Sequence, residues 1–392
     1  MDRKGFCVLP FNTLYVENNR VRLCCESEEN TSHYLNSKTG IMDIWNNDFY
    51  KNIRQSMIDG KLPDICRICK LNEDAGEQSK RQWENSRVRD VNVFQDIINN
   101  GPNSFDVRPS NKCNLECVMC NGAVSSAITQ RVKAYNDPNL PIRIQDDWDQ
   151  SKYITDYVKE NAENVYQLKF CGGEPFLLPE VNDLLEFLSK TGHAEHIELT
   201  VLTNGTVIRE KWFENYISKF QKVKINVSID GTGDILEYVR WPTKWDKIQS
   251  NILFLRSLET KSLKFRVSLA PVLHLLNALE IHRLFAFAGL YDIDIALNPV
   301  YQTSNETWIT TALLTKDLKH QAVDNFKDMQ DHFPTLRFKL GKEFIYNLIN
   351  EEYDPDPKQV EYLRRVVKYW DSHRPVSFLD QFPHLGYLLT DK

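Results

Sequence analysis

Short runs of β-forming residues alternate with longer amphipathic segments over the middle of the chain. Six of these runs are apolar enough for buried strands, and apolar residues at helical spacing mark the segments between them. Alternation of this kind predicts an α/β fold with a parallel sheet and helical crossovers. The predicted strands are 104–108, 165–170, 197–202, 223–229, 264–269 and 293–300, and the predicted helices are 123–135, 147–162, 180–190, 208–219, 246–257 and 278–288.

The first 90 residues follow a different pattern. β-forming residues on both sides of 17–19 predict a hairpin, and apolar positions from Ile44 to Met57 predict a helix that Gly60 ends. The charged segment Lys70–Arg89 is expected to be a solvated connecting helix or linker.

The chain beyond residue 300 is predicted to be mainly helical, with apolar residues at helical spacing over 314–333 and 360–370. This tail either closes the mouth of the α/β domain or packs as a cap. We therefore expect three segments along the chain, 1–90, 100–300 and 301–392.

Composition narrows the class of protein. Hydrophobic residues make up 42% and charged residues 26% of the 392 residues, which is typical of a globular protein. A net charge of −6 without a basic tract argues against non-specific nucleic-acid binding, although a structured RNA substrate stays open. No apolar run reaches the roughly 18 residues of a membrane span, and the N-terminal run is too short for a signal peptide. A cytoplasmic protein is expected.

The cysteines are concentrated in the first part of the chain. Eight of the nine lie within the first 120 residues, so they do not form a disulfide framework spread over the fold. Clustered cysteines without a secretion signal are typical of metal ligands in a reducing cytosol. They are Cys7, Cys24, Cys25, Cys66, Cys69, Cys113, Cys117, Cys120 and Cys171.

Three of them, Cys113, Cys117 and Cys120, have the spacing C-x3-C-x2-C. Closely spaced thiolates bind iron–sulfur clusters, and three ligands on a four-iron cluster leave one iron open to bind something else. From the triplet alone, a zinc knuckle or three unrelated buried thiols are the alternatives.

The triplet, with Asn114 directly after its first cysteine, resembles the cluster loop of the radical S-adenosylmethionine (radical SAM) enzymes. The resemblance implies a [4Fe–4S] cluster whose open iron holds the amino and carboxylate groups of SAM. One electron then cleaves SAM, and the 5′-deoxyadenosyl radical abstracts a hydrogen from the substrate. It also implies a partial (β/α)6 barrel over about 100–300, and an electron donor such as flavodoxin or ferredoxin.

Reactive groups of parallel barrels lie at the C-terminal ends of the strands. The turn Gly172-Gly173-Glu174-Pro175 follows the second predicted strand and resembles the family's GGEP motif, which holds the amino group of SAM. Glycines let a backbone approach a ligand closely, and carbonyls and a carboxylate accept hydrogen bonds from an ammonium.

Three further strand ends carry family-like residues. Thr203 and Asn204 support SAM or form a plain strand-to-helix turn. Ser228 and Asp230 share one strand face, which suits contacts to the ribose or to the SAM carboxylate and ammonium, and a capped strand end is the alternative. Val300 is placed against the adenine by the same resemblance.

The N-terminal cysteines resemble the ligands of a twitch domain, the shorter form of the SPASM auxiliary-cluster domain. In the family a Gly lies five residues before the second cysteine; here Asn19 takes that place, which makes Cys24 the ligand and Cys25 the spare, with a swap left open. In most relatives this module follows the barrel, whereas here it precedes it. The implied ligands of an auxiliary [4Fe–4S] cluster, or of a structural zinc ion, are Cys7, Cys24, Cys66 and Cys69.

These motifs predict an oxidative radical SAM enzyme that acts on a peptide or protein. Dehydrogenation of a sugar-like or cyclitol small molecule is the rival reaction. A zinc-bearing interaction protein without catalytic chemistry is the rival outside enzymology.

Overall fold

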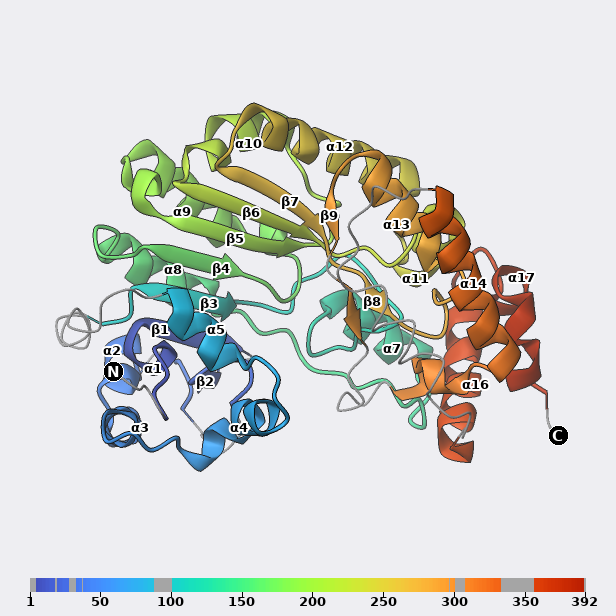
Figure 1. Cartoon of the computed structure of the whole chain (residues 1–392), viewed down its shortest axis with the longest axis horizontal. Coiled ribbons are helices and arrows are strands. Elements are labelled where there is room, and N and C mark those ends of the chain that lie inside the picture. The colour runs from blue at the N-terminus through green and yellow to red at the C-terminus, as the bar shows by residue number, and fades with distance from the viewer. Residues whose placement is uncertain are drawn as a thin grey trace. The chain divides into compact units, whose positions relative to one another are not determined.

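The computed structural model describes residues 5–17, 20–27, 33–36, 38–87, 101–295, 297–299, 307–332 and 356–390 (Figure 1). The chain divides into two compact units, and each unit contains several segments of the chain. Unit 1 comprises 1–111, 148–201 and 211–223, and unit 2 comprises 112–147, 202–210 and 224–392. The organisation into 1–90, 100–300 and 301–392 stays a prediction.

Unit 1 contains a mixed sheet with the strand order β2-β1-β3-β4-β5. Its N-terminal strands form the predicted antiparallel hairpin, and β1 then pairs with β3 in parallel, as β3 does with β4 and β4 with β5. The bounds are Thr13–Glu17 for β1, Arg20–Arg22 for β2, Ser104–Arg108 for β3, Gln167–Phe170 for β4 and Glu198–Thr203 for β5.

The two faces of this sheet differ in polarity. Phe105 of β3 is fully buried, and its ring lies 5.8 Å from that of Tyr157 in α8, Ser151–Glu160. Side chains alternate along a strand, so Asp106 and Arg108 point to the opposite face. Helix α9, Pro179–Lys190, packs against α8.

The helix predicted from Ile44 to Met57 is two helices, α2 at Ile41–Trp45 and α3 at Asp48–Ile58. The side chain of Asn47 accepts a hydrogen bond from the Tyr50 amide at 2.9 Å and so caps the start of α3. Because asparagine is a strong N-cap, it starts a new helix where the apolar spacing alone predicts a continuous one.

Unit 2 contains the strand order β6-β7-β9, with β7 and β9 parallel. The last predicted strand, 293–300, is divided between β9 and β10, and β10 pairs with β8 in a separate sheet. Pro299, which has no amide hydrogen, lies in β10, in agreement with the preference of proline for short or edge strands over central ones. The bounds are Lys222–Val227 for β6, Phe265–Leu269 for β7, Val272–Leu273 for β8, Asp294–Ile295 for β9 and Asn298–Pro299 for β10.

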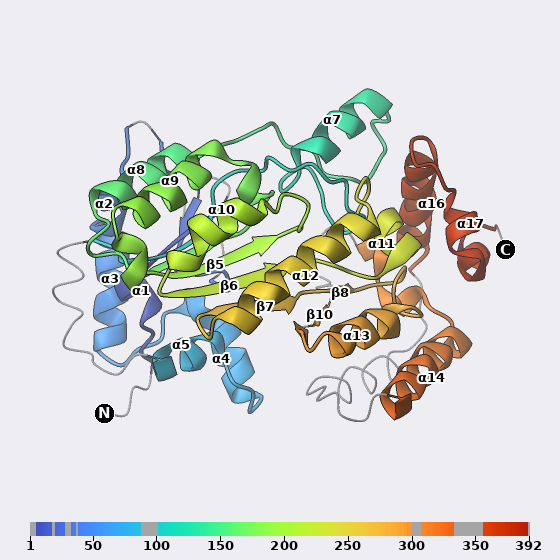
Figure 2. The same cartoon turned by 90° about the horizontal axis from the view of Figure 1, so that it is seen from above.

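The remaining described helices include those that the sequence predicts and two that it does not, α11 and α17. In unit 2, α17 packs against α11 and α16 (Figures 1 and 2). The predicted α/β class, with mostly parallel pairing and a helical C-terminal region, is confirmed. The bounds are Ser126–Tyr135 for α7, Glu210–Asn215 for α10, Gly233–Val239 for α11, Trp245–Lys261 for α12, Ile281–Leu290 for α13, Lys316–His332 for α14, Pro357–Asp371 for α16 and Phe378–Gln381 for α17.

Among the residues described, no helix combines the length and the apolar character needed to cross a membrane.

Candidate functional site

The three cysteines of the C-x3-C-x2-C motif interact with one another in unit 2. A side-chain hydrogen bond from Cys120, together with the nearby Arg240, lowers the pKa of the buried Cys117 thiol. The same bond, burial and the neighbouring Cys113 raise the pKa of Cys120. A thiolate is the form that binds iron, so the loop favours a metal-ligating state at one of its three sulfurs.

Backbone hydrogen bonds hold this loop. The Glu116 amide donates to the Trp241 carbonyl at 2.6 Å and the Val118 amide to the Val239 carbonyl at 2.9 Å, which ties the loop to the end of α11. On its other side, the Ser125 hydroxyl, which caps α7, donates to the Leu115 carbonyl at 2.7 Å. The cysteines are therefore carried on a fixed backbone.

The turn after β5 contacts the cluster loop. The side-chain amide of Asn204 donates to the Asn114 Oδ1 at 2.9 Å and lies 3.9 Å from the Cys113 Sγ. Thr203 instead accepts a hydrogen bond from the Gly205 amide at 3.1 Å and closes the turn itself. Thr203 fits the turn interpretation and Asn204 contacts the loop of Cys113, and the predicted support of SAM by these residues stays a prediction.

Asp230 is fully buried, and protein groups bind both of its carboxylate oxygens. Oδ2 accepts from Arg240 Nε at 2.6 Å, and Oδ1 accepts from the Val272 amide at 2.8 Å. Arg240 Nη1 in turn lies 3.8 Å from Cys117 Sγ. Asp230 therefore holds a cation against the Cys117 sulfur, and its predicted contact with SAM stays a prediction.

Arg240 is a residue that the sequence analysis missed. It lies ten positions after Asp230, on the far side of a short helix, α11, that the sequence pattern does not predict. Ser228, whose amide donates to the Thr203 carbonyl at 2.8 Å, is half-buried. Val300 lies outside the described residues.

The GGEP turn belongs to unit 1, and its geometry requires glycine. Gly172 and Gly173 have positive φ angles of 73° and 50°, and a Cβ on Gly172 would lie 2.7 Å from the Cβ of Arg108. Glu174 is fully buried, and its carboxylate accepts from the Phe176 amide at 3.1 Å. It thus begins the short 3-10 turn that Pro175 enters.

The sheet face opposite α8 is charged. Lys169 Nζ lies 2.7 Å from Asp106 Oδ2, and Arg108 Nε lies 3.4 Å from Glu17 Oε1. Cys171 Sγ lies 3.9 Å from Asp106, and burial raises the pKa of this thiol to about 11. Cys171 is therefore a protonated, packed thiol beside the GGEP turn.

The four predicted auxiliary ligands also come together in unit 1. Burial raises the pKa of all four thiols, to about 12 at Cys24 and Cys66, and Cys7 interacts electrostatically with the other three. Cys7 and its apolar neighbours form a small core, against which Cys24 and Cys66 pack. Cys24 packs on this core and interacts with Cys66, whereas Cys25 interacts with Tyr15, so these contacts favour Cys24 over Cys25.

The segment expected to be a solvated linker supports this cysteine cluster. It forms α4, Arg67–Asp74, and α5, Lys80–Arg87. From α5, Asn85 and Arg81 both donate to the Phe6 carbonyl, at 2.8 and 2.9 Å. The segment is helical and mostly exposed, as expected, and some of its long polar side chains also satisfy backbone polar groups of the loop around Cys7.

The nine cysteines are free thiols. Within the described ranges, no three His, Cys, Asp or Glu side chains are arranged so that they could hold a metal ion. A [4Fe–4S] cluster binds each thiolate at a different iron and does not require ligands that close together. The donor chemistry of both cysteine sets fits iron–sulfur binding.

Residues 107–288 match the family model of the radical SAM superfamily. This part of the chain is a radical SAM domain. Members of the superfamily are enzymes that use SAM and a [4Fe–4S] cluster, and this radical SAM chain carries the corresponding cysteine loop and GGEP turn.

Two curated relatives are similar over part of the radical SAM chain. The S-adenosylmethionine-dependent nucleotide dehydratase RSAD2 of Oncorhynchus mykiss is 25% identical over 134 residues, 32% of each chain. The antilisterial bacteriocin subtilosin biosynthesis protein AlbA of Bacillus subtilis (strain 168) is 26% identical over 140 residues, 34% of this chain and 27% of AlbA. The similarity thus spans about a third of the relatives' length.

Solved structures are similar at low sequence identity. The anSMEcpe enzyme with bound AdoMet gives a TM-score of 0.41 at 17% identity, over 59% of each chain. Streptococcus suis SuiB bound to precursor peptide SuiA gives a TM-score of 0.39 at 15% sequence identity, over 73% of this chain and 68% of that chain.

Proposed function

We propose that this chain is a radical SAM enzyme that carries two [4Fe–4S] clusters and oxidises a peptide or protein. Three thiolates hold the SAM-binding cluster and four hold the auxiliary cluster. The ligands of the SAM-binding cluster are Cys113, Cys117 and Cys120. Those of the auxiliary cluster are Cys7, Cys24, Cys66 and Cys69.

The observation that carries the proposal is the burial of four thiols next to one another in unit 1. Each of the four has a raised pKa, because burial disfavours a thiolate. A centre that binds thiolates and brings positive charge offsets this cost, which is why such sites couple metal binding to folding. Four cysteines without a metal centre have no comparable reason to be gathered in a reducing cytoplasm.

When bound, the SAM cluster supplies the electron that cleaves SAM into methionine and the 5′-deoxyadenosyl radical. The chain's own residues hold and orient the participants. Asn204 approaches the Cys113 sulfur and Arg240 the Cys117 sulfur. The backbone carbonyls of the GGEP turn and the Glu174 carboxylate offer hydrogen-bond acceptors to the SAM ammonium. Ser228, Asp230 and Val300 complete the proposed SAM contacts.

The overall reaction is a two-electron oxidation of the substrate. Bound SAM would supply the radical that removes one hydrogen atom, and an auxiliary cluster held by the four N-terminal cysteines would take up the second electron while a proton passes to the surroundings. An external donor such as flavodoxin or ferredoxin supplies the electron for SAM cleavage.

The names of the relatives indicate two substrate classes. AlbA is named for bacteriocin biosynthesis, which supports a peptide, whereas RSAD2 is named a nucleotide dehydratase, which supports a small molecule. Both similarities span about a third of this chain, so the shared part supports SAM chemistry rather than one substrate. The module around Cys7 favours the peptide class through its twitch-like pattern, with a sugar-like or cyclitol substrate as the alternative.

The test is iron and sulfide per chain after anaerobic purification. The wild type is expected to hold about eight irons, and a Cys113→Ala/Cys117→Ala/Cys120→Ala variant about four. The matched control is Cys171→Ala, which removes a buried thiol outside both sets and is expected to leave the iron content unchanged.

Zinc in place of about four irons in the wild type, with no iron left in the triple variant, would contradict the auxiliary cluster. Colourless protein with zinc alone would instead support the non-catalytic interaction protein.

A further inference from the structure

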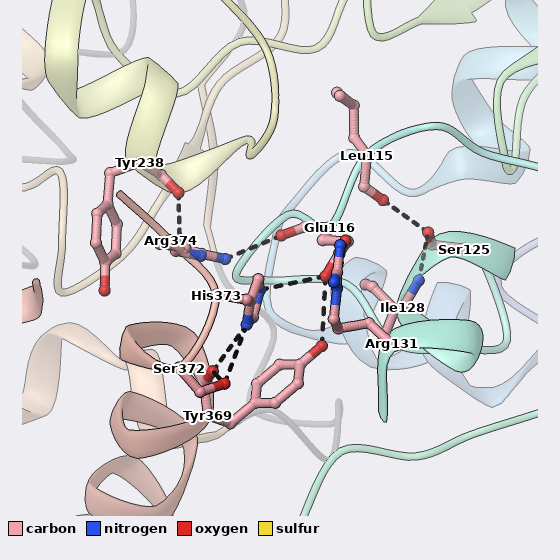
Figure 3. Close-up of polar contacts among 10 residues, drawn as sticks. All are labelled: Leu115, Glu116, Ser125, Ile128, Arg131, Tyr238, Tyr369, Ser372, His373 and Arg374. Atoms are coloured by element: carbon pink, nitrogen blue, oxygen red, sulfur yellow. Dashed lines mark hydrogen bonds and ion pairs between the residues drawn. The ribbon is translucent and has the colours of Figure 1, made fainter. Parts of the chain in front are cut away.

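The C-terminal segment contacts the cluster loop through a buried polar network (Figure 3). Its centre is Glu116, the residue before Cys117, whose carboxylate is 8% exposed. Three side chains converge on this carboxylate: Arg131 of α7 at 3.3 Å, Tyr369 of α16 at 3.4 Å and His373 at 3.3 Å.

Arg374 binds the backbone of the same loop. Its Nη2 donates to the Glu116 carbonyl at 3.0 Å and its Nη1 to the Tyr238 carbonyl at 2.6 Å. The guanidinium contacts two rings that also pack on each other, 4.6 Å from the centre of Tyr238 and 5.0 Å from that of Trp370. Arg374 is 7% exposed, so one buried side chain joins the cluster loop, α11 and the end of α16.

Two buried cations therefore act on Cys117. Arg240 approaches its sulfur directly at 3.8 Å, and Arg374 acts on it from the neighbouring carbonyl. Salt screens buried charges much less than exposed ones. The Glu116 carboxylate places a negative charge next to these cations.

We propose that Arg374 and Glu116 are positioning residues that fix the cluster loop and set the reduction potential of the cluster at Cys113, Cys117 and Cys120. The inference rests on the proposed function, since it requires a cluster at these thiols. Net charge and hydrogen bonding around the sulfurs set cluster potentials. Reduction adds negative charge, so the Arg374 guanidinium favours the reduced cluster and the Glu116 carboxylate disfavours it.

The test is a redox titration of the full chain, followed by electron paramagnetic resonance. The signal that changes when SAM is added identifies the cluster with the open iron. Arg374→Gln is expected to shift its midpoint to a more negative potential, and Glu116→Gln to a more positive one. Arg365→Gln is the matched control, because Arg365 lies on α16, the helix that ends three residues before Arg374, is 39% exposed and pairs with Glu361.

Opposite shifts in the two variants, with the control at the wild-type midpoint, support the proposal. Wild-type midpoints in both variants, or an equal shift in the control, overturn it. If Arg374→Gln does not retain its cluster, the direction of the Glu116→Gln shift decides, because this near-isosteric change leaves the carbonyl bond to Arg374 in place. A wild type without any SAM-responsive signal refutes the proposed function itself, which separates the two failures.

Discussion

Arg240 and Asp230 form a buried ion pair of 2.6 Å, in which the side chains are 8% and 0% exposed. Arg240 also reaches toward Cys117, so the pair links the strand end at Asp230 to the cluster loop. Removing one partner of a buried pair leaves an uncompensated charge, which costs far more than the loss of a surface pair.

The first prediction follows from this ion pair. Asp230→Asn is expected to lower the free energy of unfolding by about 3–5 kcal/mol, because Arg240 stays buried without its counter-charge. Urea unfolding of the anaerobic protein, followed by tryptophan fluorescence, measures it. Glu361→Gln, which breaks the exposed pair with Arg365, serves as the control and is expected to change stability by less than about 1 kcal/mol.

The second prediction concerns the GGEP turn. Gly172→Ala combines a positive φ with a Cβ clash against Arg108, so it is expected to weaken SAM binding about tenfold or more, equivalent to at least about 1.4 kcal/mol. Gly192 has a similar φ of 86° and open space around its Cα. Gly192→Ala therefore controls for backbone strain alone, and SAM binding equally weak in both variants would argue against a tight turn at Gly172.

The third prediction separates the adjacent cysteines. Cys24→Ser is expected to lose about four irons per chain, whereas Cys25→Ser is expected to keep them, because Cys24 is the member of the pair that interacts with Cys7 and Cys66. Iron analysis of the two single variants measures this. The reverse pattern would exchange the two assignments.

The fourth prediction is a dependence of stability on pH. Burial lowers the pKa of His274 to about 4, below the value of about 6.5 expected in an unfolded chain. Between these values the unfolded chain takes up a proton that the folded protein does not, so acid favours unfolding. His274 alone is expected to cost about 2 kcal/mol of stability from pH 7 to pH 5.

His274→Gln is expected to flatten this part of the stability profile, measured by urea unfolding at several pH values. The same substitution at His320, on the exposed side of α14, provides the comparison. An identical acid slope in wild type and His274→Gln would assign the loss of stability to other groups.

The sequence predicts what depends on local pattern. Apolar spacing predicts the six strands of the parallel sheet, the hairpin before Cys24 and the helices that flank the strands. The spacing of three cysteines predicts the cysteine loop. Where Asn47 caps a helix, a single residue overrides the pattern and changes the element. The contacts of Arg240 and Arg374 were not predictable, because packing alone brings these distant positions to one loop.

The parallel pairing of β1 with β3 has a consequence for how the chain can be divided. Five residue pairs join these strands, from Thr13 opposite Ser104 to Glu17 opposite Arg108. A shortened chain that starts after residue 90 would leave this edge of β3 without a partner, and bare strand edges recruit other chains. On the ribosome, β1 must likewise wait for about 90 further residues before its partner strand exists, so the N-terminal module cannot complete its fold before the α/β domain begins to form.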